Sequence, residues 1–568
     1  MKWTAKASPK PEIVAHLQEV LQVDYTIAYL LAQRDISTFE EAKNFFRPSL
    51  KQLHSPWLMK GMEKAVERIQ KAIKNQERIL IYGDYDVDGT TSVALLYSYF
   101  SKFYPHITPY IPDRYQEGYG VSYQGIDFAS DNEISLIIAL DCGIKAIDKV
   151  AYAKEKGIDF IICDHHRPGA EIPEAVAVLD PKQEDCKYPY KELCGCGVGF
   201  KLLQAFHEKE ERNFKDLVPY LDLVATAIGS DIVPITGENR ILAYHGLKII
   251  NHQPRPGFLA IIQLIKKKEL SITDVVFIIG PRINAAGRMK HGLHAVELLI
   301  EEDVKQAETF ATEIEKYNAD RRETDQNITA EALALIEAHN EQKNYTSVVY
   351  QEHWHKGVIG IVASRLTETY YRPTLVFTKS GEKLAASARS VKGFDVYNAL
   401  EESAEFIEQF GGHKYAAGLT LEEKNYPKFK AKFEEVVKNS IAPELLQPEL
   451  NYDLELNLED ITPKFYRILK QFAPFGPGNM SPLFYSKHIK DTGYAKGVGK
   501  DEEHLKCSLY QKNKRERISA IGFGLGRHAG AIRQKTAFES IYSIEENEWN
   551  NQVNLQLRLR DLRLIETD

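Results

Sequence analysis

Three aspartates occupy alternate positions in the stretch YGDYDVDGTT, which begins at Tyr82. These residues, Asp84, Asp86 and Asp88, follow ILIY, an apolar run typical of a buried strand. Carboxylates so close together raise one another's pKa unless they face water or a cation. A single aspartate between a strand and a helix is more often an N-cap than a metal ligand, and for Asp84 alone the cap is the better interpretation. Whether these aspartates cap a helix or bind a cation therefore depends on whether other acidic residues of the chain lie near them.

Two further apolar runs end in polar clusters of the same kind. The run ISLIIALDCG reaches Asp141, and IDFIICDHH ends at Asp164, His165 and His166. A later apolar segment, LDLVATAIGSD, ends at Asp231. In an open parallel sheet the ligand site lies beyond the carboxyl ends of the strands, so these side chains should meet at one edge. A shared site explains three such strand ends better than chance does.

Carboxylate oxygens are the ligands that Mg²⁺ and Mn²⁺ prefer, and a histidine favours Mn²⁺. Two divalent ions roughly 3.5–4 Å apart would neutralise the acids and lower the pKa of a water between them. Such a pair also clamps the attacking and leaving oxygens of a phosphoryl displacement. We therefore predict a centre of two divalent ions, Mn²⁺ or Mg²⁺. His166 would orient a ligand or donate to a phosphate oxygen.

The elements that must position these residues follow from the apolar pattern. Apolar positions three and four apart predict helices from about residue 10 to about 75, as in MEKAVERIQKAIKN. Short apolar runs that alternate with helical segments then predict a parallel α/β sheet: RILIYGD, ISLIIALDCG, IDFIICDHH and AVAVLDP. From about 295 to about 340, charges of alternating sign predict a long polar helix.

A second α/β region is expected from about 345 to about 440, and stretches such as NLQLRLRDLRLI predict a small β-barrel after about 450. The predicted fold class is therefore α/β, with a parallel-sheet domain, a long helix, a second α/β domain and a C-terminal barrel. The expected units are an N-terminal helical segment, the first α/β domain, the connector helix, the second α/β domain and the barrel: 1–70, 71–295, 296–344, 345–445 and 450–568.

Composition narrows the class of protein. The chain has 568 residues, of which 43% are hydrophobic and 27% charged, as in soluble globular proteins. The stretch MKWTAKASPKPEIV has no apolar core of a secretory signal, and no apolar run approaches a membrane span, so we expect a cytoplasmic protein without a membrane partner. We expect the six cysteines to be reduced structural thiols, because Cys194 and Cys196 are too close for the usual zinc-finger spacing. A net charge of −8 still allows a local basic groove.

Ordered motifs carry a resemblance to a known family. DYDVDG, ALDCG, CDHH and GSD resemble the four motifs of the DHH phosphoesterase superfamily. Within it, GPRINAAGRM, GVIGIVASRL, SARS, FGGHKYAAG, FAPFGPGNMSP and NEWN resemble, in matching order, stretches of the RecJ family of exonucleases over nearly the whole chain. One departure is AIGSD, where the family more usually has a Thr-Val-Ala-Asp type of run.

The resemblance implies roles for particular residues. The implied metal ligands, which are also the catalytic set together with His166, are Asp84, Asp86, Asp88, Asp141, His165 and Asp231. The second α/β domain, called DHHA1 in the family, would face the metal site across a cleft and bring His413 to the substrate phosphate. Arg282, Ser387 and Arg389 would bind a 5′-terminal phosphate, a task that suits the arginine fork. As alternatives, either arginine could be a surface ion-pair partner, residues 411–412 could form a turn, and GVIGIVASRL could begin a helix that accepts phosphate.

The C-terminal region has the composition of a nucleic-acid-binding surface. From Lys500 to Lys535 there are nine lysines and arginines against four acids. The resemblance implies an OB-type fold, a common binder of single strands. The predicted DNA contacts are the hairpin residues Lys512, Lys514, Arg515 and Arg517, and the loop residues Tyr115 and Tyr119. The alternatives are a solvated hairpin tip and tyrosines that only pack locally.

The implied activity is that of a single-strand-specific 5′-to-3′ exodeoxyribonuclease that releases 5′-mononucleotides in DNA repair and recombination. Single-stranded DNA is the expected partner, with a helicase and a single-strand-binding protein as further partners of a monomer. An alternative is a DHH phosphodiesterase for short oligonucleotides or cyclic dinucleotides, which lacks the basic tail. A second alternative is a catalytically silent single-strand-binding scaffold, which would tolerate Asp141→Ala.

Overall fold

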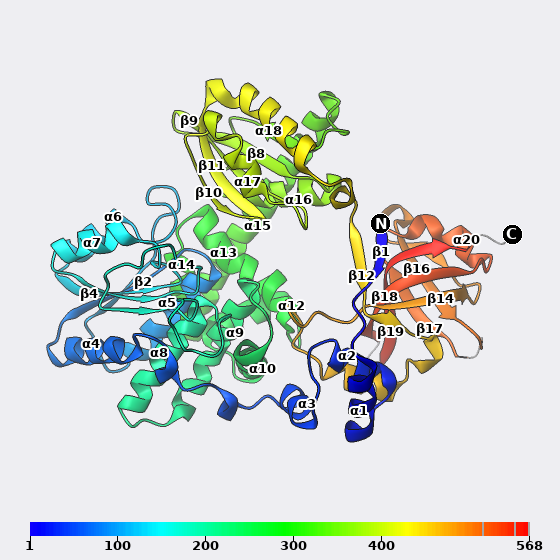
Figure 1. Cartoon of the computed structure of the whole chain (residues 1–568), viewed down its shortest axis with the longest axis horizontal. Helices are drawn as coiled ribbons and strands as arrows, with labels where there is room; N and C mark the ends of the chain where they lie inside the picture. The colour runs from blue at the N-terminus through cyan, green and yellow to red at the C-terminus, as the bar shows by residue number, and fades with distance from the viewer. Residues whose placement is uncertain (514–515, 550–551, 566–568) are drawn as a thin grey trace.

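The computed structural model describes residues 1–513, 516–549 and 552–565. Two α/β units and a β-barrel surround the centre of Figure 1, with the first unit at the left, the second at the top and the barrel at the right. The fold class predicted above is confirmed. Within the described ranges, no helix is long and apolar enough to cross a membrane.

The first unit is built on a parallel sheet of five strands in the order β3-β2-β4-β5-β6. The strands are β2 (Arg78–Gly83), β3 (Ile107–Tyr110), β4 (Ile134–Leu140), β5 (Asp159–Cys163) and β6 (Ala177–Leu179). Alternate residues enter two different cores, since Ile79 and Ile81 belong to one and Leu80 and Tyr82 to the other. Burial on both faces explains why these strands are continuous apolar runs.

Helices cover both faces of this sheet (Figure 1). They are α4 (Met62–Lys74), α5 (Val87–Phe100) and α8 (Gly195–Lys209) on one core, and α6 (Tyr123–Asp131) and α7 (Ile147–Glu155) on the other. Further helices extend the first core: α9 (Leu221–Ser230), α10 (Gly237–His252), α11 (Pro256–Ile265), α12 (Ile272–Asp274), a π-helix (Val275–Ile279), α13 (Gly280–Met289) and α14 (Leu293–Ile300).

The predicted connector is the 35-residue helix α15 (Val304–Ala338). Its first half buries Ala311 and Ile314 in the core of the first unit. Its second half buries Ala332 and Ile336 beneath the second unit. One helix therefore joins the two α/β units through their cores.

The second unit has a mixed sheet of five strands in the order β10-β11-β9-β8-β7. Its elements are β7 (Ser347–Tyr350), α16 (Ile359–Tyr370), β8 (Thr374–Ser380), β9 (Lys383–Arg389), α17 (Val396–Glu401), β10 (Gln409–His413), β11 (Ala416–Glu422) and α18 (Tyr426–Ser440). The turn raised as an alternative for residues 411–412 is not formed, because both glycines lie within β10. A Cβ on Gly412 would lie 2.4 Å from the carbonyl oxygen of Ala416, so β10 and β11 approach too closely for a side chain there.

The C-terminal sheet closes into the expected barrel, because β14 pairs with both β18 and β16. Its elements are β13 (Leu454–Glu455), α19 (Pro463–Lys470), β14 (Phe484–Asp491), β15 (Lys496–Val498), β16 (His504–Tyr510), β17 (Ile518–Gly522), α20 (Ala529–Arg533), β18 (Phe538–Trp549) and β19 (Gln552–Leu564). Closure leaves few free strand edges, which limits edge-to-edge association.

The N-terminal segment is divided between two units. β1 (Lys2–Ala5) pairs in parallel with β12 (Glu449–Tyr452), the strand before the barrel. Helices α1 (Pro11–Leu21), α2 (Tyr25–Ala32) and α3 (Phe39–Phe46) lie beside the barrel, and their buried residues belong to its core. Helix α4 instead packs on the first sheet. The domain boundaries given above stay a prediction.

Candidate metal centre and substrate site

The three aspartates after β2 have different environments. Asp86 is the N-cap of α5, since its Oδ1 accepts from the backbone N–H of Gly89 at 3.1 Å. Asp84 is buried and accepts from the N–H of Gly120 at 3.2 Å. The cap predicted for Asp84 alone therefore belongs to Asp86, two residues further on. Asp88 lies in the first turn of α5 and is also buried.

The start of α8 holds Asp88 in place. The two carboxylate oxygens of Asp88 accept from the N–H groups of Gly195 and Cys196, each at 2.7 Å. A helix N-terminus favours a negative charge, which partly offsets the cost of burial. A Cβ on Gly195 would lie 2.6 Å from the Cβ of Asp141, so only glycine fits there. The motif LCGCGVG therefore serves close packing, and all six cysteines are buried free thiols, as expected.

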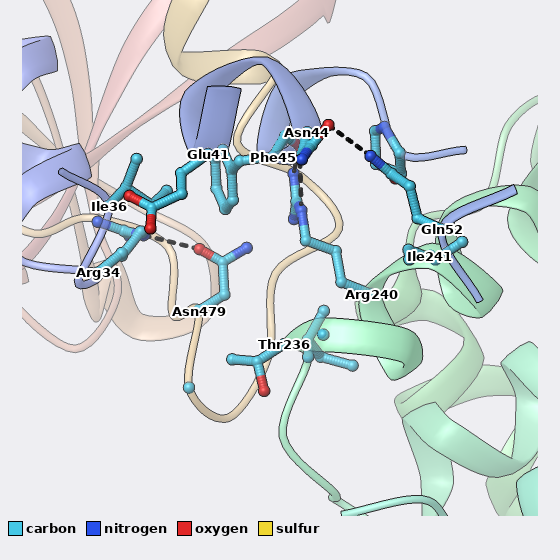
Figure 2. A pocket seen from close by; sticks show the side chains of 14 residues that line it. Arg34, Ile36, Glu41, Asn44, Phe45, Gln52, Thr236, Arg240, Ile241 and Asn479 are labelled. Atoms are coloured by element: carbon cyan, nitrogen blue, oxygen red, sulfur yellow. Dashed lines mark hydrogen bonds between the residues drawn. The ribbon is translucent and has the colours of Figure 1, made fainter. Parts of the chain in front are cut away.

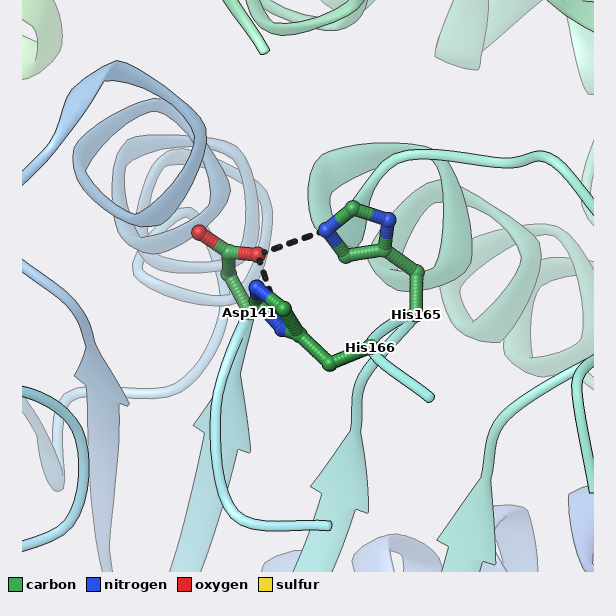
Figure 3. A group of neighbouring side chains, drawn as sticks. All are labelled: Asp141, His165 and His166. Carbon is green, nitrogen blue, oxygen red and sulfur yellow. Dashed lines mark ion pairs between the residues drawn. The ribbon is translucent and has the colours of Figure 1, made fainter. Parts of the chain in front are cut away.

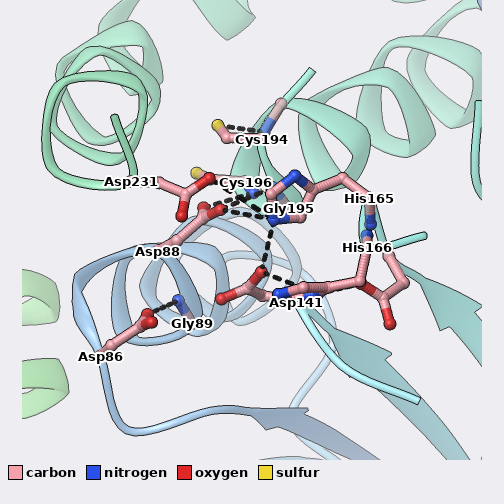
Figure 4. A network of polar contacts seen from close by, with 12 residues as sticks. Asp86, Asp88, Gly89, Asp141, His165, His166, Cys194, Gly195, Cys196 and Asp231 are labelled. Atoms are coloured by element: carbon pink, nitrogen blue, oxygen red, sulfur yellow. Dashed lines mark hydrogen bonds and ion pairs between the residues drawn. The ribbon is translucent and has the colours of Figure 1, made fainter. Parts of the chain in front are cut away.

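His165, at the end of β5, lies at the centre of the acids (Figure 4). Its Nε2 is 3.2 Å from Oδ1 of Asp141, 3.5 Å from Oδ2 of Asp231 and 3.8 Å from Oδ2 of Asp88. The convergence predicted at the strand ends is thus present. Asp231 is positioned by a helix and not by a strand, because it is the C-cap of α9.

Several buried polar atoms of this group lack a hydrogen-bond partner among the described residues. They are Oδ2 of Asp84, Oδ1 of Asp141, both ring nitrogens of His165 and Oδ2 of Asp231. Unpaired buried polar atoms are costly, and native structures contain few of them. Ligand atoms of Asp88, His165 and Asp231 lie within 4.8 Å of one another, as do those of Asp141, His165 and His166. This donor set fits divalent cations.

The electrostatics support the same interpretation. Burial, followed by the charge of Asp86, raises the pKa of Asp88 to about 7. Burial and neighbouring carboxylates also raise the pKa of Asp84, Asp141 and Asp231. Burial and the adjacent His166 lower the pKa of His165 to about 3, so its imidazole is neutral and able to bind a metal. A bound cation would relieve the repulsion among the carboxylates.

His166 has a different partner. Its Nδ1 lies 2.7 Å from Oδ1 of Asp164. The same nitrogen lies 4.0 Å from Oδ1 of Asp141, and Figure 3 shows this second contact from close by. Burial alone would lower the pKa of His166, but the hydrogen bond to Asp164 and its charge raise that pKa to about 9. The ring is therefore cationic at neutral pH and able to donate to an anion. Tyr119 lies beside it, with its Oη 3.3 Å from Nε2 of His166.

A cavity of about 240 Å³ opens beside the acids. Its lining includes the acids Asp86, Asp88 and Asp231 together with Arg114, Asn284 and Arg288. The sequence analysis did not predict the last three, although Arg114 directly precedes the predicted DNA contact Tyr115, and Asn284 and Arg288 lie in GPRINAAGRM. Asn284 and Arg288 are four residues apart on α13 and therefore share one helix face.

Ser387 and Arg389 meet the start of α16. Nη1 of Arg389 donates to Oγ of Ser387 at 2.9 Å, and a Cβ on Gly360 would contact both side chains at 3.0 Å or less. Arg288 also reaches this region, since its Nη1 donates to the carbonyl of Gly357 at 2.8 Å. Burial and nearby arginines, Arg389 among them, lower the pKa of Arg288 to about 9, so the cluster would gain from a bound anion.

Arg282 does not join this group. Its Nε lies 2.6 Å from Oε2 of Glu315 on α15, and its Nη1 donates to the carbonyl of Ile278. The ion-pair alternative raised for Arg282 therefore describes its environment. His413 is exposed at the end of β10, where its Nδ1 accepts from the N–H of Tyr415.

The predicted DNA contacts have mixed environments. Tyr115 is exposed and donates through its hydroxyl to the carbonyl of Arg288. Lys512 and Arg517 are exposed near the tip between β16 and β17. Lys514 and Arg515 lie outside the described residues.

A second basic surface crosses the barrel and was not predicted. In the strand register Lys496 opposes Lys506, Lys506 opposes Ile521, and Ile521 opposes Arg558. Lys496, Lys506 and Arg558, called the basic row below, thus lie across four neighbouring strands. Arg558 also lies 5.1 Å from the ring centroid of Phe523, an exposed aromatic residue. For Arg558 the signal in the sequence was the alternation in LQLRLR, which places every second side chain on the same face of the strand.

Comparison with known proteins agrees with this geometry. Family models match in succession: the DHH family, N-terminal domain at residues 78–228, the DHHA1 domain at 342–439 and the RecJ OB domain at 452–561. The fold is thus that of a DHH phosphoesterase with a DHHA1 domain. The chain is 35% identical to the single-stranded-DNA-specific exonuclease RecJ of Bacillus subtilis (strain 168), over 100% of this chain and 71% of that protein.

It is also 33% identical to the exonuclease of the same name from Salmonella typhimurium, over 94% of this chain and 95% of that one. The crystal structure of RecJ in complex with Mn²⁺ from Thermus thermophilus is similar with a TM-score of 0.85 and 26% identity, covering 100% of this chain and 80% of that one. The chain therefore belongs to the RecJ family, and the predicted resemblance is confirmed.

Proposed function

We propose that the protein is a single-stranded-DNA-specific exonuclease that hydrolyses phosphodiester bonds from the 5′ end and releases 5′-mononucleotides. The observation that carries the proposal is the convergence on His165 of buried ligand atoms that lack a hydrogen-bond partner among the described residues, in a chain that belongs to the RecJ family. DNA repair and recombination are the processes that would use this activity.

The metal centre would be held by the six predicted residues, Asp84, Asp86, Asp88, Asp141, His165 and Asp231. When bound, a pair of Mn²⁺ or Mg²⁺ ions would polarise the scissile phosphate and lower the pKa of an attacking water. Asp86 is the least buried of the three acids after β2, and it faces the cavity that Asp88 and Asp231 also line. Cationic His166 would donate to a phosphate oxygen, and Asp164 would keep its ring oriented.

We assign the 5′-terminal phosphate to Arg288, Ser387, Arg389 and the start of α16. Two guanidinium groups and a helix N-terminus together form a strong anion site. This proposal replaces Arg282 by Arg288, because the contacts of Arg282 are with Glu315 and with the carbonyl of Ile278 in the preceding π-helix. A phosphate held there while the next phosphodiester lies at the acids would set the 5′-to-3′ direction.

From the acids the DNA strand would pass Tyr119 and Tyr115 and continue to the barrel. His413 would contact the substrate phosphate. The basic row and Phe523 offer the combination of cations and an aromatic face that single strands bind. The hairpin residues Lys512, Lys514, Arg515 and Arg517 would add weaker contacts. A monomer in the cytoplasm that receives strands from a helicase and a single-strand-binding protein completes the proposal.

The test uses single strands labelled at the 5′ or the 3′ end, incubated with Mn²⁺, Mg²⁺ or chelator. We expect mononucleotides from the 5′ label first, and no product with chelator or with Asp141→Ala. Release from the 3′ label first would refute the direction, and unchanged cleavage by Asp141→Ala would refute the site. Equal rates on long strands and on dinucleotides would favour the small-substrate alternative.

A further inference from the structure

The motif FAPFGPGNMSP belongs to none of the sites above. It lies between α19 and β14 of the barrel unit, and residues 471–480, here called the docking loop, contact the first α/β unit. The N–H of Ile235 donates to the carbonyl of Pro477 at 2.7 Å. A Cβ on Gly476 would lie 2.5 Å from Cγ1 of Ile235, so the Ile235 side chain packs directly on the glycine and leaves no room for another side chain.

Arg240 of α10 reaches from the first unit into the docking loop. Its guanidinium donates to five carbonyl oxygens, those of Phe45, Gln471, Phe472, Ala473 and Pro474. The strongest of these bonds are to Phe472 at 2.9 Å and to Phe45 at 3.0 Å. The carbon of the guanidinium also lies 3.8 Å from the ring centroid of Phe45.

This use of an arginine is specific. Arg240 is only 5% exposed, and the acceptors of its hydrogen bonds are neutral carbonyls of α3 and the docking loop. An arginine has five N–H donors in a rigid fork, and here one side chain binds two segments that belong to another unit. Removing it would take away this donor from the carbonyls of Phe45, Gln471 and Ala473, and a buried carbonyl without a partner is destabilising.

Arg34 and Asn479 fix the docking loop from the other side (Figure 2). Nε of Arg34 donates to Oδ1 of Asn479 at 2.7 Å, and its Nη2 donates to the carbonyl of Met480 at 2.8 Å. The amide of Asn479 donates to the carbonyls of Phe472 and Pro474, each at 2.8 Å. The curvature that presents these carbonyls to Arg240 is therefore built into the barrel unit.

We propose that Arg240 is a positioning residue that fixes the barrel, together with helices α1–α3, to the unit that carries the acids. This inference rests on the proposed function, because a fixed barrel holds the distal part of a strand in line with the metal centre. The barrel then acts as a second, pre-positioned binding site on one strand, and a strand that spans both sites gains from a high effective concentration. A strand too short to reach the barrel gains nothing from Arg240.

The experiment compares Arg240→Ala with Arg372→Ala, a matched control. Arg372 is 2% exposed and also donates to several neutral acceptors, but these lie within or next to the second α/β unit. Spin labels on Lys64→Cys and Lys490→Cys report the distance between the first unit and the barrel by pulsed electron paramagnetic resonance. The native cysteines are buried, so labelling is confined to the introduced ones.

We expect a narrow distance distribution for the parent and for Arg372→Ala, and a broad one for Arg240→Ala. We also expect the KM for long strands to rise roughly tenfold or more in Arg240→Ala, as the effective concentration falls, with an unchanged rate on a tetranucleotide. Arg240→Lys should recover part of both effects. A narrow distribution in Arg240→Ala, or equal broadening in Arg372→Ala, would overturn the inference.

Two further outcomes are kept apart. If Arg240→Ala does not fold, Asn479→Ala disturbs the same loop from the barrel side and should broaden the same distribution. If the parent protein cleaves no DNA, the proposed function fails, while the distance measurement still decides the role of Arg240.

Discussion

Replacing Asp231 by asparagine should stabilise the metal-free protein above neutral pH and remove its response to Mn²⁺. Oδ2 of Asp231 has no hydrogen-bond partner among the residues described, so the substitution breaks no hydrogen bond at that atom. Ligand atoms of Asp231 and Asp88 lie within 4.8 Å of each other, and two ionised carboxylates at that distance repel by about 3 kcal/mol at an effective dielectric constant of about 20.

The sign of the effect depends on pH. Burial and the charge of Asp86 raise the pKa of Asp88 to about 7, and burial and the charge of Asp88 raise the pKa of Asp231. A carboxyl with a raised pKa stabilises the fold below its unfolded pKa of about 4, and that contribution is lost as the pH rises through the folded pKa. The difference between parent and Asp231→Asn should therefore be small near about pH 5 and large only once the pH exceeds the raised pKa values of both carboxyls, of which that of Asp88 is about 7.

Calorimetry with chelator, at about pH 5 and at a pH above the raised pKa values, measures this difference in stability. A gain of about 3 kcal/mol corresponds to a rise in Tm of roughly 6–12 °C for a unit of this size. Addition of Mn²⁺ should raise the Tm of the parent and leave the variant nearly unchanged, since a ligand stabilises only the state that binds it. Glu184→Gln, an equal change of charge at an exposed position of the same unit, should do neither. A variant that melts like the parent at high pH, or responds equally to Mn²⁺, would refute the assignment of Asp231.

Other substitutions test the substrate contacts and the packing of the site. In a competition assay, Arg288→Ala should lower the preference for 5′-phosphorylated over 5′-hydroxyl strands roughly tenfold or more, because a charge-assisted hydrogen bond contributes about 1.5–3 kcal/mol. Arg282→Ala should keep that preference, and the reverse pattern would assign the phosphate to Arg282 instead. In anisotropy titrations with chelator, Arg558→Glu should weaken single-strand binding more than Lys512→Glu does, and should lower the slope of affinity against salt concentration by about the value of one phosphate contact. A larger effect of Lys512→Glu would favour the hairpin tip as the binding surface. Gly195→Ala should yield a folded protein with little Mn²⁺ bound, because the added methyl would lie 2.6 Å from the Cβ of a predicted ligand; normal metal content would show that the site tolerates the shift.

The strands that carry the acids could be predicted because burial on both faces leaves a continuous apolar run in the sequence. β3 was missed, since its four residues include Pro109 and it lies at the edge of the sheet. The N-terminal helices were predicted from their apolar periodicity, but their partner was not. Periodicity defines which face is buried and contains no information about a partner more than 400 residues away, such as the barrel core that receives Leu17.

The candidate site was predictable where a simple topological rule applies. Asp141 and His165 follow parallel strands, and such ends converge at one edge. Asp231 follows a helix, so no strand rule places it, and only the packing of α9 against α5 brings it to the others. The choice between Asp84 and Asp86 as the cap depends on a hydrogen bond to Gly89, and side-chain direction at that level cannot be read from spacing alone.

The choice between the two arginines of α13 as the phosphate ligand could have been narrowed from the sequence. Arg282 and Arg288 are six residues apart, and at about 100° per residue their side chains point in directions that differ by roughly 120°. Only one of them can therefore face a phosphate held at the start of α16. Asn284 is four residues before Arg288 and shares its face, and both line the cavity beside the acids. Helix geometry alone thus allows one arginine in the proposed phosphate site, and the ion pair of Arg282 with Glu315 favours the other one, Arg288.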